Sequence, residues 1–381
     1  MKSFQTLPIL LVFLVMGMAD AMGPLAEAVR SQYHLSQVLA TLLPFTVFIA
    51  FAGFSVPGGL LAARIGKKRL LMLGLATCAL GVGVPVLMTP GFGLLLGCIF
   101  LLGVGTTFLQ VAANPLMRDV SPAGSYGRNL ALAQGVKGLG SSGSAWLVGA
   151  VSVIPLLAGL GWLGAFPLFL ALLLLALIVV APLKITETRL PKPPGLRASL
   201  ALLREPTVVR AVVGIFLYVG AEVCLARFLP STLQTLGWSG PRAAFLGPGL
   251  VFLAITAGRL TAGALGGNPR RWFQGSALVG TLGLGLLMTG TRGAAVPGVL
   301  LCGLGFANIW PMLFALTVEA LPDRNAEISG LLCMAISGGA LVPLAMGGLR
   351  DVGWNGASFL VPLIGFLYLL FLSLDNSRSA G

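Results

Sequence analysis

Long apolar runs constrain the fold of this chain more than any other feature of its sequence. About 20 apolar residues in a row are the length that an α-helix needs to cross a bilayer. Backbone groups inside a bilayer find no water, so each run is expected to be helical. We predict an all-α polytopic membrane protein with twelve transmembrane helices, spans 1 to 12, near residues 7–29, 40–63, 70–88, 92–117, 129–153, 162–182, 207–230, 243–265, 273–290, 294–320, 328–348 and 357–374.

The composition excludes a soluble domain of any size. Charged residues make up 9% of the chain and hydrophobic residues 57%, whereas a soluble domain carries about a quarter charged residues. The net charge of +13 does not indicate a nucleic-acid partner, because the basic residues lie in short loops between apolar runs. We therefore expect the lipid bilayer, and no nucleic acid, as the surroundings of the protein.

Lysine and arginine also predict the orientation of the chain. Most of the 24 Lys and Arg residues fall on the segments that are internal if the N-terminus is internal. The positive-inside rule then places both termini in the cytoplasm. The expected location is a cell membrane, taken as a bacterial inner membrane, which the protein crosses many times.

The chain divides into two similar halves. Its longest polar interruption suggests an N-terminal six-helix bundle at 1–183, a cytoplasmic linker at 184–206 and a C-terminal six-helix bundle at 207–381. Gly103 and Gly105 recur as Gly303 and Gly305 at an offset near 200. Such repeats are typical of transporters built from two pseudo-symmetric bundles.

Four polar side chains interrupt spans 4 and 5. Gln110 and Asn114 are four residues apart, and Gln134 and Lys137 are three apart, so each pair shares one face of its helix. Polar groups within spans usually face the bundle interior or a watery cavity. We predict that all four bind substrate. The alternatives are hydrogen bonds between helices and, for Lys137, a structural ion pair.

Two carboxylates inside spans are candidates for proton coupling. Asp20 lies in span 1, and Glu222 lies at the matching place in span 7. A carboxylate within the membrane is costly and usually functional. The alternatives are a permanent Asp20–Lys137 ion pair and a protonated, hydrogen-bonded Glu222. Arg227 follows Glu222 by five residues and lies on another face, where it either gates the outer side or snorkels to the membrane surface.

Span 10 contains a proline that predicts a break in the helix. Asn308 and Trp310 lie just before Pro311, and proline removes a helix hydrogen bond and frees a carbonyl. We expect the freed backbone carbonyls to be open to a ligand, with Asn308 and Trp310 binding substrate. Trp310 either stacks on a ring face of the ligand or packs within the bundle.

The loop after span 2, Gly59–Arg69, resembles the signature of the major facilitator superfamily. The resemblance implies the major facilitator fold, and it implies an inner gate formed here by basic residues. Ala63 replaces the usual acidic residue, so the charge lock of that gate is expected to be looser. The basic gating residues are Arg64, Lys67, Lys68 and Arg69.

Further stretches resemble the fucose permease-like sugar:proton symporters. They are QVAANP at 110–115, the run 129–140, YVGAEV at 218–223 and the segment 308–348. By this resemblance, Asp20 matches an acidic proton-coupling residue and Gln134 a polar residue of the sugar site. Gln110 stands where a second, glutamate, coupling residue is found, and Lys137 where the sugar site has an asparagine.

These observations predict a secondary active transporter that works by alternating access. The resemblance implies proton-coupled uptake of a small polar solute such as a sugar or sugar derivative. The alternatives are transport of a small organic anion, or uniport. A drug or metabolite exporter fits less well, because span 5 lacks a Gly-Pro pair.

We do not expect an enzyme. The only histidine is His34, and neither a HExxH nor a GxSxG motif occurs. A Lys137–Ser141 dyad is the one catalytic arrangement that the spacing allows. No cofactor or metal is predicted, and the family resemblance implies a monomer.

Overall fold

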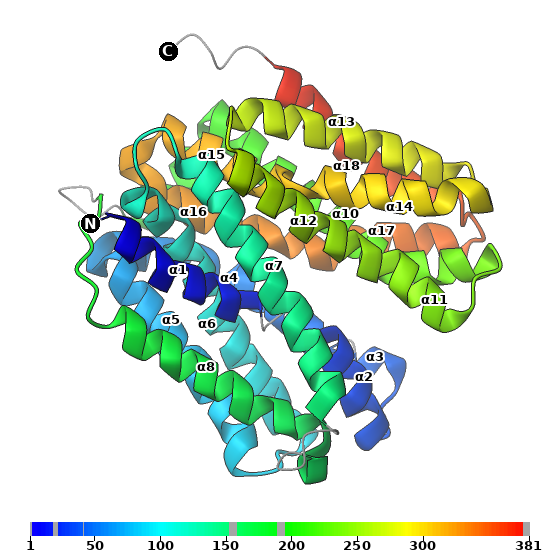
Figure 1. Ribbon diagram of the computed structural model, residues 1–381, viewed down its shortest axis with the longest axis horizontal. Coiled ribbons are helices and arrows are strands. Elements are labelled where there is room, and N and C mark those ends of the chain that lie inside the picture. Colours follow the sequence, from blue (N-terminus) through cyan, green and yellow to red (C-terminus); the bar gives the residue numbers. More distant parts are fainter. Residues whose placement is uncertain (1, 18–21, 41, 152–157, 189–194, 376–381) are drawn as a thin grey trace. The chain divides into compact units, whose positions relative to one another are not determined.

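Helices form every regular element in the part of the chain that the structure describes (Figure 1). That part of the computed structural model comprises residues 2–17, 22–40, 42–151, 158–188 and 195–375. Nine helical stretches within it are long and apolar enough to cross a membrane. Helices also make up most of the described residues of the other three predicted spans, so the prediction of an all-α, multi-pass membrane protein is confirmed.

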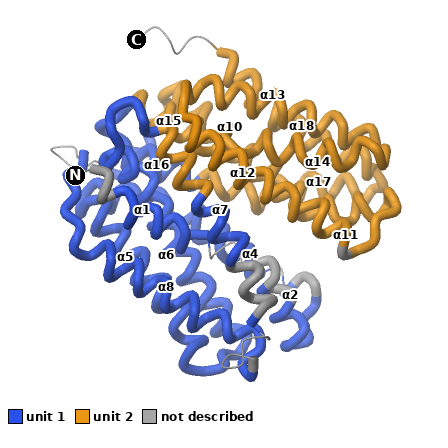
Figure 2. The backbone as a smooth tube through the Cα atoms, viewed as in Figure 1, with its two compact units in different colours: residues 1–126, 136–201, 321–334 blue, residues 127–135, 202–320, 335–381 orange. Residues whose placement is uncertain are grey.

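The chain forms two compact units, coloured separately in Figure 2. Unit 1 consists of residues 1–126, 136–201 and 321–334, and unit 2 of residues 127–135, 202–320 and 335–381. A short segment of span 5 thus belongs with the second half of the sequence, and the beginning of span 11 belongs with the first half. The predicted bundle and linker boundaries are not tested by this division.

Unit 1 contains the helices of spans 1 to 4 and 6, most of span 5, the short helix that follows span 6 and one short helix from span 11. They are α1 (Lys2–Met16), α2 (Met22–Gln32), α3 (Gln37–Ala40), α4 (Leu42–Ile65), α5 (Lys67–Leu87), α6 (Phe92–Val120), most of α7 (Tyr126–Ala150), α8 (Ala165–Val180), α9 (Leu196–Ala201) and α16 (Asn325–Met334).

Unit 2 contains the remaining helices together with residues 127–135 of α7. They are α10 (Pro206–Thr235), α11 (Gly240–Ala244), α12 (Leu250–Leu265), α13 (Pro269–Met288), α14 (Arg292–Ala307), α15 (Ile309–Ala320), α17 (Gly338–Asp351) and α18 (Leu360–Leu374).

The glycine repeat of the sequence marks equivalent helix crossings in the two units. A Cβ added to Gly105 of α6 would stand 2.7 Å from a backbone carbonyl of α5. A Cβ on Gly305 of α14 would stand 3.0 Å from a backbone carbonyl of α13. Gly103 and Gly303 meet α4 and α12 in the same way. Small residues allow membrane helices to approach this closely, so the repeat reflects one packing scheme used twice.

Candidate functional site

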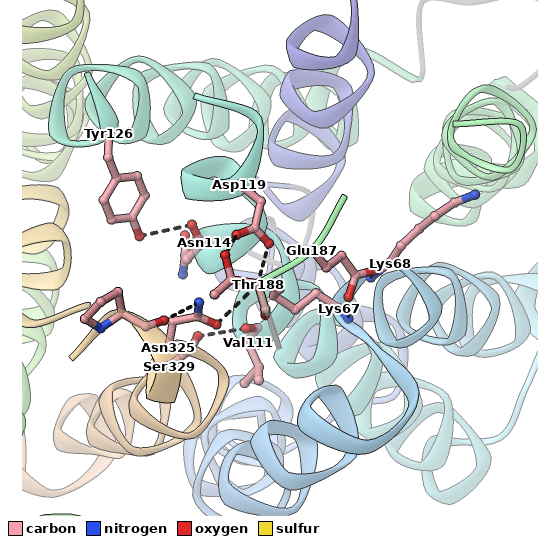
Figure 3. Close-up of polar contacts among 11 residues, drawn as sticks. Lys67, Lys68, Val111, Asn114, Asp119, Tyr126, Glu187, Thr188, Asn325 and Ser329 are labelled. Carbon is pink, nitrogen blue, oxygen red and sulfur yellow. Dashed lines mark hydrogen bonds and ion pairs between the residues drawn. The ribbon is translucent and has the colours of Figure 1, made fainter. Parts of the chain in front are cut away.

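A buried ion pair lies where α5 begins and α6 ends (Figure 3). Lys67 and Asp119 form it, and each side chain is only 1% exposed. The Lys67 Nζ also donates to the Thr188 carbonyl at 3.1 Å and to Asn325 Oδ1 at 3.3 Å. The Thr188 hydroxyl donates to Asp119 at 2.9 Å. Buried charges are costly unless paired and hydrogen-bonded, so this group joins α5, α6 and α16 to the segment after α8.

The carboxylate of Glu187 caps the N-terminus of α5. Gly66 precedes the helix with φ of 100° and brings no side chain to cap it. The Glu187 oxygens instead accept from the backbone amides of Lys67 at 2.7 Å and Lys68 at 3.1 Å. Negative charge at a helix N-terminus is stabilising. We call Lys67, Asp119, Glu187, Thr188 and Asn325 the Lys67 cluster.

A second ion pair lies at the N-terminus of α16, beside α9. Glu327 is buried and accepts two hydrogen bonds of 2.6 Å from the Arg324 guanidinium. Its carboxylate also accepts from the Ser199 hydroxyl of α9 at 2.6 Å. Arg324 also donates to the Ala198 carbonyl of α9 at 3.0 Å. Both members of this bidentate pair, a strong kind of hydrogen-bonded contact in proteins, therefore contact α9.

The predicted gating residues differ in their surroundings. Lys67 is buried, and Lys68 donates to two carbonyl oxygens just beyond α8 at 2.6 Å each. Arg64 and Arg69 are exposed. Arg227 is also exposed, and its guanidinium lies 5.6 Å from the ring centre of Phe228.

Two carboxylates lie beside Lys67 although the nearby loop residue is Ala63, and the looser charge lock expected from the sequence stays a prediction. Asp119 and Glu187 supply the negative charge that Ala63 lacks, and both contact Lys67. Ala63 lines a small pocket together with Lys67, Thr188 and Asn325. A carboxylate from another segment therefore replaces the one absent from the loop.

Pro115 releases a backbone carbonyl that a serine of another helix then binds. Proline has no N–H, so the Val111 carbonyl four residues earlier in α6 loses its helix donor. The Ser329 hydroxyl of α16 donates to this carbonyl at 2.8 Å, and both residues are buried. Gly59 allows the approach, since a Cβ there would stand 2.7 Å from a carbonyl of α16.

Replacement of Ser329 by alanine is expected to cost about 1–3 kcal/mol of stability, because the Val111 carbonyl is left buried without a donor. Chemical unfolding in detergent measures the loss. Ser329→Ala combined with Pro115→Ala is the matched control, since an alanine at 115 restores the helix donor. If the double variant is no more stable than Ser329→Ala, this reason is wrong.

Gln110 and Asn114 form a buried polar pair on α6. The Asn114 amide donates to Gln110 Oε1 at 3.3 Å, and both side chains are buried. The Asn114 backbone carbonyl accepts from the Tyr126 hydroxyl at 3.1 Å (Figure 3). The predicted shared face is confirmed, whereas substrate binding by this pair stays a prediction.

The polar residues of span 5 fall into different units. Lys137 belongs to unit 1, and its backbone carbonyl accepts from the Ser141 hydroxyl at 3.0 Å. Gln134 belongs to unit 2 and is buried. Asp20 lies outside the described residues, so neither its predicted proton coupling nor its alternative ion pair with Lys137 is tested.

Span 10 is broken where the sequence predicts, but the freed carbonyl is already bound. α14 ends at Ala307 and α15 begins at Ile309, with Asn308 between them at φ −107° and ψ 0°. Pro311 lacks the N–H that would donate to the Ala307 carbonyl. Arg259 Nε of α12 donates to that carbonyl at 3.0 Å. The expectation of a carbonyl open to a ligand is therefore wrong for Ala307.

Two buried polar atoms beside this break have no hydrogen-bonding partner among the described residues. They are Asn308 Oδ1 and Trp310 Nε1. The Asn308 amide nitrogen donates to the Gly258 carbonyl at 3.3 Å, and Trp310 is 4% exposed. Leaving a buried donor or acceptor unpaired costs about 1–3 kcal/mol. An acceptor and a donor two residues apart suit a ligand hydroxyl, which both donates and accepts.

Another polar group of unit 2 links an arginine to a carboxylate. Arg259 is 8% exposed, and its Nη2 donates to the Tyr218 hydroxyl at 3.1 Å. Glu222 lies four residues after Tyr218 on α10, within hydrogen-bonding reach of the same hydroxyl. Arg259 and Glu222 thus interact through Tyr218.

Sequence reasoning missed Arg259, Asp119, Glu187 and Tyr218. Arg259 carried a usable signal, because an arginine within a span is expensive and usually functional. Asp119 and Glu187 lie at the ends of apolar runs, where charged residues are ordinary. Only the folded chain shows that both lie against Lys67.

The fold and these groups define a class of protein. Membrane-spanning helices that carry buried polar groups beside a helix break are typical of secondary transporters. The chain belongs to the Major Facilitator Superfamily, whose family model matches residues 9–343.

Characterised relatives resemble the chain over nearly its whole length. The glucose/galactose transporter of Brucella abortus biovar 1 (strain 9-941) is 27% identical, over 99% of this chain and 95% of that protein. The L-fucose-proton symporter of Escherichia coli (strain K12) is 23% identical, over 92% of this chain and 88% of that protein. The crystal structure of the transporter FucP in the outward conformation has the same fold, with a TM-score of 0.86, 20% identity and 99% coverage of both chains.

Proposed function

We propose that this protein is a secondary active transporter that takes up a sugar or sugar derivative together with protons by alternating access. The unpaired acceptor of Asn308 and the unpaired donor of Trp310 carry the proposal, because sugar hydroxyls can both donate and accept hydrogen bonds. Full-length similarity to a glucose/galactose transporter and to a fucose-proton symporter supports it.

The buried arginine of unit 2 favours a neutral substrate over an organic anion. Each nitrogen of the Arg259 guanidinium has a protein partner: Ala307 O at 3.0 Å, Tyr218 Oη at 3.1 Å and Gln134 O at a long 3.5 Å. A substrate carboxylate would have to displace these contacts. The two buried polar atoms beside the break that lack a partner among the described residues belong to a neutral amide and a neutral indole.

The remaining roles follow from the predicted residues. The substrate-binding residues are Gln110, Asn114, Gln134, Lys137, Asn308 and Trp310. Asp20 and Glu222 carry the proton. The protein is a monomer in the lipid bilayer of a bacterial inner membrane, with two six-helix bundles, a linker at 184–206 and both termini in the cytoplasm. The Lys67 cluster, Arg64, Lys68 and Arg69 then lie on the cytoplasmic side, and Arg227 lies toward the outer side.

Transport by purified protein in liposomes tests the proposal. Counterflow of labelled D-glucose, D-galactose and L-fucose reports binding and translocation without a gradient, and accumulation against a proton gradient reports coupling. Glu222→Gln should lose accumulation but retain counterflow, because the glutamine cannot change its charge. Glu205→Gln is the matched control, since Glu205 is exposed just before the same helix. Absence of counterflow for all three sugars in the wild type contradicts a sugar transporter.

Trp310→Phe isolates the indole N–H, because it keeps an aromatic ring. The loss of one hydrogen bond to the ligand, about 0.5–1.5 kcal/mol, should weaken sugar binding up to about tenfold. The ligand-free protein should lose little stability, since the N–H has no partner in it. A thermal-shift titration measures the affinity, and Trp354→Phe, at an exposed tryptophan, is the control. Equal affinities of Trp310→Phe and wild type would remove this residue from the site.

A further inference from the structure

We propose that Arg259 is the residue that positions the sugar-binding side chains of the α14–α15 break, acting through the carbonyl that Pro311 releases. The proposal rests on the proposed function for the identity of the ligand. Arg259 itself does not touch the sugar in this proposal.

The break is attached to α12 by two hydrogen bonds from opposite directions. Arg259 Nε of α12 donates to the Ala307 carbonyl at 3.0 Å, and the Asn308 amide of the break donates to the Gly258 carbonyl of α12 at 3.3 Å. Gly258 permits this contact, because a Cβ there would stand 2.6 Å from the Ala307 Cβ. The backbone on the N-terminal side of Asn308 is therefore fixed by a neighbouring helix and not by its own helix ladder.

This attachment determines where the unpaired polar atoms point. Asn308 Oδ1 belongs to the same amide group whose nitrogen is bound to α12. Trp310 lies two residues further on, and its ring packs against Phe314 with 5.8 Å between ring centres. Without a donor for the Ala307 carbonyl, the backbone at the break would no longer be held in this conformation. Through the Ala307 carbonyl, Arg259 therefore fixes the positions of the two protein atoms proposed to bind the ligand, Asn308 Oδ1 and Trp310 Nε1.

Arginine suits this task better than lysine. Its planar guanidinium contacts three separate elements at once, through Ala307 of α14, Tyr218 of α10 and Gln134 of α7. A lysine has one nitrogen and cannot hold all three. The Tyr218 contact also brings the carboxylate of Glu222 within reach of the same network, which connects the proposed proton carrier to the sugar-binding break.

Four variants test the positioning role. They are Arg259→Lys, Arg259→Met, Arg259→Met with Pro311→Ala, and Arg259→Met with Glu222→Gln. Arg210→Met is the control, because Arg210 lies on α10 and forms a more exposed ion pair with Asp375. Hydrogen exchange of the peptides covering 305–312 is measured without ligand. Affinity and transport are measured with whichever of D-glucose, D-galactose and L-fucose the wild type accepts.

We expect Arg259→Met to raise hydrogen exchange at 305–312 and to weaken sugar affinity about tenfold or more, with a smaller change in the maximal transport rate. Arg259→Lys should be intermediate. Pro311→Ala should restore protection in the Arg259→Met background, because the new amide at 311 donates to the Ala307 carbonyl. It should not restore sugar affinity, because the helix then continues through Asn308 and the break that positions the binding side chains is lost. Arg210→Met should match wild type.

Two results would overturn the positioning role. One is unchanged exchange and affinity in Arg259→Met. The other is recovery of protection with Glu222→Gln and not with Pro311→Ala, which would make Arg259 a charge partner only. If the wild type accepts no sugar, the proposed function fails, while the exchange measurements still decide whether Arg259 fixes the break.

Discussion

Replacement of Lys67 by methionine should lower the free energy of unfolding by about 3–5 kcal/mol, because removal of one partner leaves a buried charge uncompensated. Asp119 is 1% exposed and, among the described residues, would keep the Thr188 hydroxyl as its hydrogen-bond donor. Asn325 and the Thr188 carbonyl would lose the same donor. Chemical unfolding of the detergent-purified protein measures the effect.

The control is a second change at the partner residue. Lys67→Met with Asp119→Asn removes both charges, so it should recover most of the lost stability. Arg69 lies two residues after Lys67, and its side chain is exposed. Arg69→Met should therefore change the stability by less than about 0.5 kcal/mol. Equal losses in the single and double variants would mean that the charge of Asp119 is not the cause.

The second large effect is expected at the crossing of α13 and α14. Gly305→Ala should cost stability at the upper end of the range of about 1–3 kcal/mol for overpacking. Its Cβ would overlap the backbone of Gly280 and stand 3.0 Å from the Ser276 carbonyl. Backbone atoms cannot move aside as side chains do, so the helices must separate. The midpoint of thermal unfolding reports the change.

An exposed glycine on the partner helix provides the comparison. Gly285→Ala of α13 meets nothing within 4 Å and should be neutral or stabilising by up to about 1 kcal/mol, since alanine is the better helix former. Gly105→Ala should repeat the loss in unit 1, where its Cβ would meet the α5 backbone. A harmless Gly305→Ala would contradict the close helix crossing.

The fold could be predicted because its determinants are local. Apolar runs of the right length give the spans, and Gly103, Gly105, Gly303 and Gly305 give the repeated packing scheme. Pro311 gives the position of the break within a few residues, since the loss of its N–H is a property of the residue itself.

The contacts at the site could not be predicted, because they join residues far apart in the chain. Lys67 pairs with Asp119 and is capped by Glu187, at separations that no periodic pattern specifies. Ala63 indicated a lost charge, but nothing near it in the sequence indicated a replacement. Arg259 donates a hydrogen bond to the Ala307 carbonyl only because α12 packs beside α14. The predicted roles of Asp20 and Lys137 stay untested.

The hydrogen bond from Ser329 to the carbonyl that Pro115 releases has a consequence for the rate of helix motion. Hydrocarbon offers no replacement donor, so α16 cannot move away from α6 without breaking the hydrogen bond from the Ser329 hydroxyl to the Val111 carbonyl. A penalty of about 1–3 kcal/mol for that bare carbonyl corresponds to a slowing of about 5- to 150-fold for any motion that separates these two helices. The Ser329 hydroxyl would then slow the separation of α6 and α16, and one substitution at this residue would change that rate.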